Sequence, residues 1–165
     1  MPPAFRPFCN LGMDEHHELR DQLRARPELL PTAVEEFLRY EAPQPGLARV
    51  ATRDCTIRGQ SIAAGDRLLL LWASANRDED AFPNAAEVIP DRYPNRHLTF
   101  GIGLHRCVGA PFASAQIRLA LAGLLRRIPD YRIDADNIIG AETGGIVFGR
   151  FSIPMTFTPG ARVNG

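Results

Sequence analysis

The sequence predicts an α+β fold in which helices and short antiparallel strands occupy separate stretches of the chain. Two helical patterns come first, strands with tight turns follow, and further strands close the sequence after one long helix. Because helices and strands do not alternate, the order does not suggest a parallel nucleotide-binding sheet. The 165 residues suit one domain or a piece of a larger one.

The first two elements are predicted helices separated by a proline. The stretch 14–26 is strongly charged and has leucines one turn apart, and Pro27 breaks it. A second helix is expected from Thr32 to Glu41, with Thr32 as its N-terminal cap and an apolar stripe along one face. Two prolines just beyond Glu41 end this helix.

Strands and an irregular stretch are expected in the middle of the chain. Strands with tight turns run from Leu47 to Leu71, and glycines at 59 and 65 mark the turns. The last part of this region, "AAGDRLLLLW", is an apolar run typical of a buried strand. Residues 74–96 are polar and contain prolines, and such a long structureless stretch is uncommon unless it serves a site.

The longest helix is expected from Pro111 to Ile128. Apolar residues recur there at helical spacing, a proline is tolerated in the first turn, and two arginines occupy the last turn. After Pro129 the sequence returns to short strands, first "YRID" and then "GGIVFGRFSIPMTFT". These strands complete the α+β pattern.

Composition excludes several classes of partner and location. Nineteen basic residues balance nineteen acidic ones, so we expect no nucleic-acid or membrane partner. The apolar runs are too short to span a bilayer, and the N-terminus is a poor secretory signal. The three cysteines, Cys9, Cys55 and Cys107, are widely spaced and odd in number, which favours a reducing, cytoplasmic location over a disulfide framework.

A glycine-rich loop with a single cysteine, "FGIGLHRCVG" at residues 100–109, precedes the long helix. It is neither a dinucleotide fingerprint nor a phosphate loop, because its third glycine is misplaced and the Lys-Ser/Thr pair is missing. The helix N-terminus and Arg106 stabilise negative charge on the Cys107 sulfur. The glycines let the backbone approach a flat ligand, and Phe100 can pack on its face. A thiolate beside a flat ligand describes a haem iron held by cysteine.

This loop resembles the haem-binding signature of the cytochrome P-450 family, F-G-x-G-x-H-x-C-x-G, and matches it at every fixed position. Glu36 and Arg39 match the family's Glu-x-x-Arg motif, and "ANRDEDAFPNAAEVIPDR" resembles its meander, which ends here in Arg92. The stretch "RVATRD" resembles the strand whose arginine, here Arg49, meets a haem propionate. The similarity runs from residue 14 to about residue 157, in the style of soluble bacterial members.

The resemblance implies the C-terminal, proximal part of the mainly helical cytochrome P-450 fold, with small antiparallel sheets. It assigns residues 14–165 to a partial domain and leaves 1–13 as an atypical segment. The implied cofactor is haem b (heme b), with Cys107 as the axial iron ligand. The other implied cofactor-binding residues are Arg49, Phe100, Gly101, His105 and Gly109, with His105 and Arg49 at the propionates. Glu36, Arg39 and Arg92 have an implied structural role, and Ile146, Val147 and Phe148 would line the substrate pocket.

The implied activity is that of a haem-thiolate monooxygenase. The family acts on small hydrophobic organic substrates with electrons from a ferredoxin- or flavodoxin-like donor. No stretch resembles the distal helix, whose acid and threonine deliver protons to oxygen, so we expect no catalytic residue here and no turnover by this chain alone. The chain also departs from the family at residues 88–90, in place of Phe-Asp-Pro, and at residues 112–116, in place of Leu-Ala-Arg-x-Glu.

Two other functions stay open at this stage. One is a non-catalytic fragment, or one half of a split protein that needs a complement. The other is a zinc-binding module that uses His97, His105 and Cys107. The sequence disfavours zinc, because it has neither a Cys-x-x-Cys pair nor an evident fourth ligand.

Overall fold

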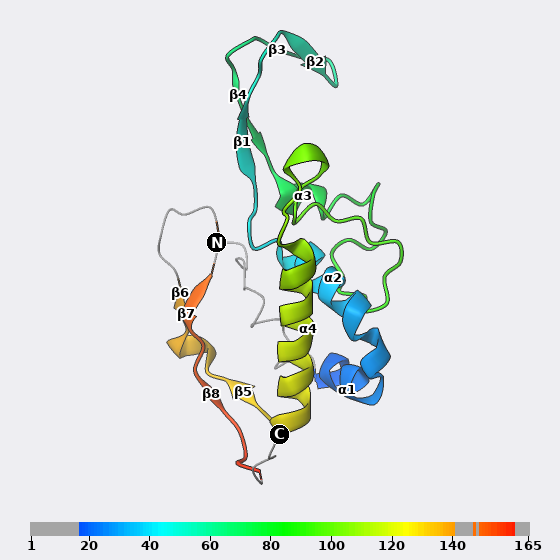
Figure 1. Ribbon diagram of the computed structural model, residues 1–165, viewed down its shortest axis with the longest axis vertical. Helices are drawn as coiled ribbons and strands as arrows, with labels where there is room; N and C mark the ends of the chain where they lie inside the picture. Colours follow the sequence, from blue (N-terminus) through cyan, green and yellow to red (C-terminus); the bar gives the residue numbers. More distant parts are fainter. Residues whose placement is uncertain (1–16, 141–146, 148, 161–165) are drawn as a thin grey trace.

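The computed structural model describes residues 17–140, 147 and 149–160. The longest helix, α4 (Ala110–Arg127), runs along the long axis of the molecule, and α1 (His17–Ala25) and α2 (Leu30–Glu41) lie beside it (Figure 1). Shorter helical segments are η2 (Pro27–Leu29), α3 (Trp72–Ala75), η3 (Gly103–His105) and η4 (Ala135–Asn137). None of the described helices is both long and apolar enough to cross a membrane.

The strands of the described residues pair into four two-stranded antiparallel sheets. Their pairs are β1 (Leu47–Val50) with β4 (Arg67–Leu70), β2 (Cys55–Ile57) with β3 (Gln60–Ile62), β5 (Arg132–Ile133) with β8 (Met155–Thr156), and β6 (Ile139–Gly140) with β7 (Arg150–Ser152). The β1–β4 hairpin projects beyond the N-terminal end of α4. Strands β5, β6, β7 and β8 lie on the side of α4 that is away from α1 and α2 (Figure 1). The α+β prediction is therefore confirmed.

The predicted helices are present, and α2 starts earlier than expected. α4 begins and ends within one residue of the prediction, and α1 covers residues 17–25, while positions 14–16 of the predicted helix lie outside the described residues. α2 begins at Leu30, two residues early, so Thr32 is not its cap. The Thr32 hydroxyl instead donates to the Leu29 carbonyl at 2.9 Å, because Pro31 and the preceding turn η2 already start the helix.

The predicted turns are correct, but the predicted buried strand is wrong. Gly59 and Gly65 have φ values of +81° and +92°, which glycine adopts without strain. β4, however, leaves Leu69 63% exposed, and the following Leu71 is 50% exposed. β4 pairs with β1 alone, and the described chain places no further layer against this hairpin (Figure 1).

The hydrophobic core lies where α1, α2 and α4 meet. Its buried members include Leu23 of α1, Val34 and Phe37 of α2, and Leu121 and Leu125 of α4. This packing holds α2 beside α4, because each Å² of apolar surface removed from water stabilises the fold by about 25 cal/mol. The loop that leads into α4 is therefore held close to α2.

Glu41 ends α2 as a buried acid that is 8% exposed. Burial raises the pKa of Glu41 to about 7, although Arg77 and Arg150 attract its charged form. The folded state thus binds the proton more tightly than the unfolded chain, whose ordinary value is 4.5. The resulting stabilisation is complete below that value and is lost as the pH rises through 7.

We therefore predict that Glu41→Gln stabilises the chain at pH 8 by roughly 3 kcal/mol at most and changes it little at pH 5. The amide cannot ionise, so the variant avoids the cost of burying a charge at high pH. Urea unfolding of both proteins at the two pH values measures the difference. An equal difference at pH 5 and pH 8 would show that the Glu41 carboxyl does not titrate differently on folding.

Candidate functional site

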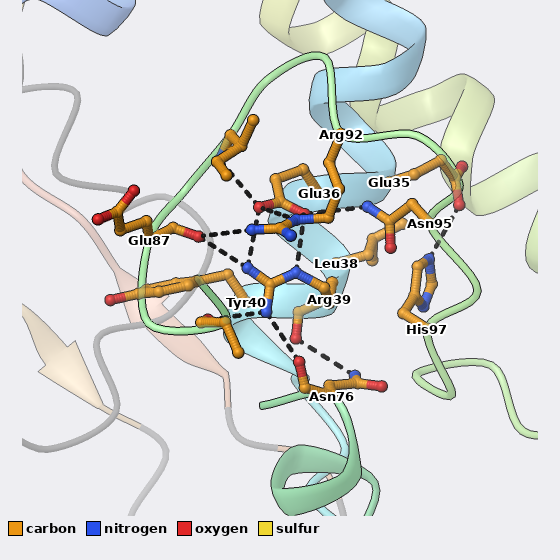
Figure 2. Close-up of polar contacts among 12 residues, drawn as sticks. Glu35, Glu36, Leu38, Arg39, Tyr40, Asn76, Glu87, Arg92, Asn95 and His97 are labelled. Atoms are coloured by element: carbon orange, nitrogen blue, oxygen red, sulfur yellow. Dashed lines mark hydrogen bonds and ion pairs between the residues drawn. The ribbon is translucent and has the colours of Figure 1, made fainter. Parts of the chain in front are cut away.

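A buried ion triad of Glu36, Arg39 and Arg92 lies between α2 and the irregular stretch 76–100 (Figure 2). Glu36 and Arg39 are three residues apart on α2, a spacing that brings their side chains together. Arg39 donates from Nε to Glu36 Oε2 at 2.8 Å and from Nη2 to Oε1 at 2.9 Å. Arg92 donates from Nε to both Glu36 oxygens at 3.0 Å. The Glu36 and Arg39 side chains are fully buried, and that of Arg92 is 8% exposed.

The remaining donors of the Glu36 triad shape the irregular stretch. Arg39 and Arg92 donate to backbone carbonyls at 2.7–3.1 Å, which belong to Asn76, Pro83, Asn84, Ala85 and Glu87. Glu36 in turn accepts from the Ile89 amide at 2.9 Å and from Asn95 Nδ2 at 3.0 Å. A stretch without helix or strand is thereby given one conformation by Glu36 and Arg39 of α2 together with its own Arg92. The predicted irregular stretch 74–96 is confirmed, apart from the short α3 at its start.

Glu36 is ionised in this arrangement. Burial alone would raise its pKa, but the hydrogen bonds from Arg39, Ile89 and Arg92 outweigh burial and lower it. One carboxylate thus balances part of the charge of two guanidinium groups, and it also accepts from one backbone amide and from the side-chain amide of Asn95. A buried charge is tolerated only when it is paired and hydrogen-bonded in this way.

The next segment, residues 97–101, is tied to the same end of α2. The Asn76 side chain accepts from the Leu98 amide at 2.7 Å and donates to the Thr99 hydroxyl at 2.9 Å. Thr99 in turn donates to the carbonyl of Leu38 at 2.6 Å. These buried contacts connect α2 and α3 to the beginning of the cysteine loop.

Cys107 lies in an open loop just before α4. Its amide donates to the Phe100 carbonyl at 2.8 Å, and its carbonyl accepts from the Ala110 amide at 3.3 Å. Gly101 and Gly103 have φ values of +69° and +71°, so the loop needs glycine at both positions. Gly109 differs, because its φ of −82° suits any residue. The Cys107 side chain is exposed at the start of an 18-residue helix.

One pocket brings five of the predicted cofactor-binding residues together. Its volume is about 280 Å³, close to the lower end of the range of about 300–1,000 Å³ usual for small-molecule sites. Its lining includes Arg49, Phe100, Gly101, His105, Cys107 and Val147. Gly109 does not line it, although a Cβ at Gly109 would lie 3.7 Å from Cys107 Sγ. Ile146 and Phe148 lie outside the described residues.

The chemistry of this pocket fits a flat cofactor with a soft metal and acidic side groups. Cys107 supplies sulfur, Arg49 and His105 supply donors for carboxylates, and Trp72 and Phe100 supply apolar surface. The loop and the first turn of α4 also expose apolar side chains that no described residue covers, and these are Ile102, Leu104, Val108 and Phe112, at 69–102% exposed. A haem that is bound through cysteine sulfur has these requirements.

The zinc alternative finds no support in the described part of the chain. Among residues 17–140, 147 and 149–160, no three His, Cys, Asp or Glu side chains are grouped as metal ligands. His97 also has both ring nitrogens in hydrogen bonds, Nε2 with Glu35 at 3.0 Å and Nδ1 with the Thr99 amide at 3.3 Å. It therefore has no nitrogen left for a metal that Cys107 and His105 would share.

Comparison with known proteins identifies the class of this site. The family model described as Cytochrome P450 matches residues 12–129, more than half of the chain. The chain belongs to the cytochrome P450 family, whose members hold haem iron through a cysteine thiolate. The prediction of the proximal, C-terminal part of this fold is confirmed.

Relatives and solved structures agree on this assignment. Mycinamicin IV hydroxylase/epoxidase of Micromonospora griseorubida is 48% identical over 143 residues, which are 85% of this chain and 36% of that protein. Steroid C26-monooxygenase of Mycolicibacterium smegmatis is 38% identical over 148 residues, which are 90% of this chain and 37% of that protein. The structure of the Bacillus subtilis bacillaene synthase cytochrome P450 PksS matches with a TM-score of 0.82 and 37% identity, covering 90% and 39% of the two chains. The chain thus spans less than two fifths of these relatives' length.

Several residues that hold the site were not predicted from the sequence. They are Glu35, Asn76, Asn95, Thr99 and Ser114, and each uses its side chain to connect segments far apart in sequence. Single polar residues in an irregular stretch or on a helix leave no periodic pattern. The one available signal was Ser114, which falls in the 112–116 departure from the family pattern.

We predict that Arg39→Ala destabilises the chain by about 3–5 kcal/mol, because it leaves the buried Glu36 carboxylate short of two donors. Arg24→Ala is the matched control. Arg24 pairs with Asp21 at 3.5 Å on an exposed face, and such a pair contributes about 0–1 kcal/mol. Urea unfolding gives both values, and equal midpoints for the two variants would mean that the Glu36 triad adds no more than a surface pair.

Proposed function

We propose that this chain forms the proximal side of a haem-thiolate monooxygenase, with Cys107 as the axial ligand of the iron. The observation that carries the proposal is the pocket that one exposed thiol shares with His105 and Arg49. The thiol precedes an 18-residue helix, whose N-terminal amides stabilise negative charge on the sulfur. Thiolate is the form of cysteine that binds metals.

The loop residues have separate roles in this proposal. Phe100 packs on the ring face and also fixes Cys107, because its carbonyl accepts the Cys107 amide. Gly101 and Gly103 give the loop its turns, and no other atom lies within 4 Å of where a Cβ would stand at Gly103. Gly109 leaves the space beside the sulfur free of a side chain, because a Cβ at this position would lie 3.7 Å from Cys107 Sγ.

His105 and Arg49 bind the two acidic side groups of the cofactor. Both residues are exposed at the pocket, one at the end of η3 and the other on β1. Arg49 donates from Nη1 to the Ala48 carbonyl at 2.9 Å. A guanidinium has five N–H donors, so this backbone contact leaves donors for a carboxylate.

The bound haem supplies the oxygen chemistry, and a cysteine ligand donates electron density that favours O–O cleavage. The chain's own work is to hold the sulfur, orient the ring and place Val147 at the pocket. No described residue is assigned a proton-transfer role. This division agrees with a chain that spans 36–39% of the length of its relatives.

The proposed substrate is a small hydrophobic organic molecule. A steroid and a macrolide appear in the names of two relatives, and Val147 contributes an apolar surface to the pocket of this chain. We extend the proposal to a ferredoxin- or flavodoxin-like electron donor and to a cytoplasmic location. The domain that carries these functions is residues 14–165, with 1–13 as a separate segment.

A second candidate function is one half of a haem protein that a further polypeptide segment completes. Two observations favour it, the partial coverage of the relatives and the exposed apolar side chains on several elements. Leu69 on β4 and Leu119 on α4, both outside the cysteine loop, are 63% and 69% exposed. In this case the chain binds haem only weakly until the complementary segment is added.

We predict that Cys107→Ser abolishes thiolate-type haem binding, whereas Cys55→Ser, an exposed cysteine on β2, leaves it unchanged. Serine keeps the size of the side chain but lacks the soft sulfur that the iron requires. The measurement is a haem titration of each purified chain, followed by the absorbance of the reduced, carbon monoxide-bound form. Identical spectra with and without Cys107 would overturn the ligand assignment.

A further inference from the structure

Glu35 has a different set of partners from its neighbour Glu36. Successive residues on a helix point about 100° apart, so Glu36 faces the irregular stretch while Glu35 faces α4 and residue 97 (Figure 2). Glu35 Oε1 accepts from the Ser114 hydroxyl at 2.8 Å, and Oε2 pairs with His97 Nε2 at 3.0 Å. The His97 side chain is only 5% exposed. Both oxygens of one carboxylate are therefore used by two other segments.

The partners of Glu35 surround the cysteine loop along the sequence. His97 precedes the loop, Ser114 follows it on α4, and Arg106 lies next to Cys107 within the loop. Hydrogen bonding from His97 lowers the pKa of Glu35 against the opposing effect of burial, and Ser114 and the charge of Arg106 lower it further. The carboxylate thus contacts the residues just before and just after the cysteine loop.

Hydrogen bonds on His97, Thr99 and Phe100 connect Glu35 to Cys107. His97 Nδ1 accepts from the Thr99 amide at 3.3 Å, so its proton is assigned to Nε2, which donates to Glu35. Phe100, the next residue, gives its carbonyl to the Cys107 amide at 2.8 Å. Moving His97 therefore moves the backbone acceptor that orients Cys107.

We propose that Glu35 is a positioning residue for Cys107, which it orients by holding His97 and Ser114 on either side of the cysteine loop. The inference rests on the proposed role of Cys107 as the haem ligand. The role of Glu35 differs from that of Glu36, because the Glu35 side chain is 39% exposed and that of Glu36 is fully buried. Loss of the Glu35 carboxylate should consequently disturb the loop more than the fold.

The first test is amide hydrogen exchange of the purified chain without haem, read by mass spectrometry. Glu35→Gln keeps the shape of the side chain but provides one acceptor oxygen for two donors. We expect the peptide that contains Thr99 and Cys107 to exchange roughly tenfold faster, while peptides of α2 and α4 stay unchanged. Glu18→Gln, an exposed acid on α1, is the matched control and should change neither.

The second test is the reduced, carbon monoxide-bound spectrum of the haem-loaded chain, which reports whether the iron is ligated by thiolate. We expect Glu35→Gln to lower the fraction of thiolate-ligated haem severalfold. Ser114→Ala removes one of the two contacts and should give a smaller change in the same direction. If Glu35→Gln does not fold, Ser114→Ala alone tests whether this contact orients Cys107. His97→Gln retains a side-chain donor and should keep more of the wild-type spectrum than His97→Leu.

Each outcome is decisive. Unchanged loop exchange in both Glu35→Gln and Ser114→Ala would overturn the inference, as would equally faster exchange throughout α2 and α4, because that is global destabilisation. If the wild-type chain gives the same spectrum as Cys107→Ser, the proposed function fails instead. Loop exchange in the haem-free chain then still shows whether Glu35 holds the segment around Cys107.

Discussion

One fully buried carboxylate, that of Glu36, holds the irregular stretch against α2. Its two guanidinium partners, Arg39 and Arg92, pair with it and bind five backbone carbonyls of the irregular stretch. A buried network of this kind is stable only when all its members are satisfied, because each unpaired charge is costly in a low dielectric. The triad therefore stabilises a single conformation of a stretch that has no secondary structure, and the cysteine loop follows this stretch in the chain.

Two adjacent acids on α2, Glu35 and Glu36, contact different segments around the site. Glu36 fixes the path of the chain, and Glu35 contacts the segments on either side of the loop. The loop itself carries apolar side chains that are almost entirely exposed, those of Leu104 and Val108. In the role that we propose for Glu35, its contacts orient the Cys107 thiol before any cofactor binds. Such preorganisation reduces the ordering cost of binding.

Much of the fold was predictable from local signals, and the residues behind the site were not. Helical spacing located α4 to within one residue, and the cysteine loop carried a ten-residue family pattern. The apolar run of β4 led to a wrong prediction of a buried strand. A strand is buried only if a second layer packs on it, and the spacing of its apolar residues does not show whether that layer is present. Asn76 and Thr99 act through long-range bonds to single backbone groups, and these leave no pattern in the sequence. Glu36 was predicted only because a family motif names it.

Hydrogen exchange of the Arg39 and Arg92 Nε–H protons tests the central claim most directly. These two protons point at Glu36 across 2.8 and 3.0 Å, and nitrogen-labelled protein makes them visible by NMR. We expect both protons to exchange only through global unfolding, with an opening free energy equal to that from urea unfolding. Exchange as fast as that of the exposed Arg24 would show that the triad opens freely, and would contradict the claim that it holds the cysteine loop in place.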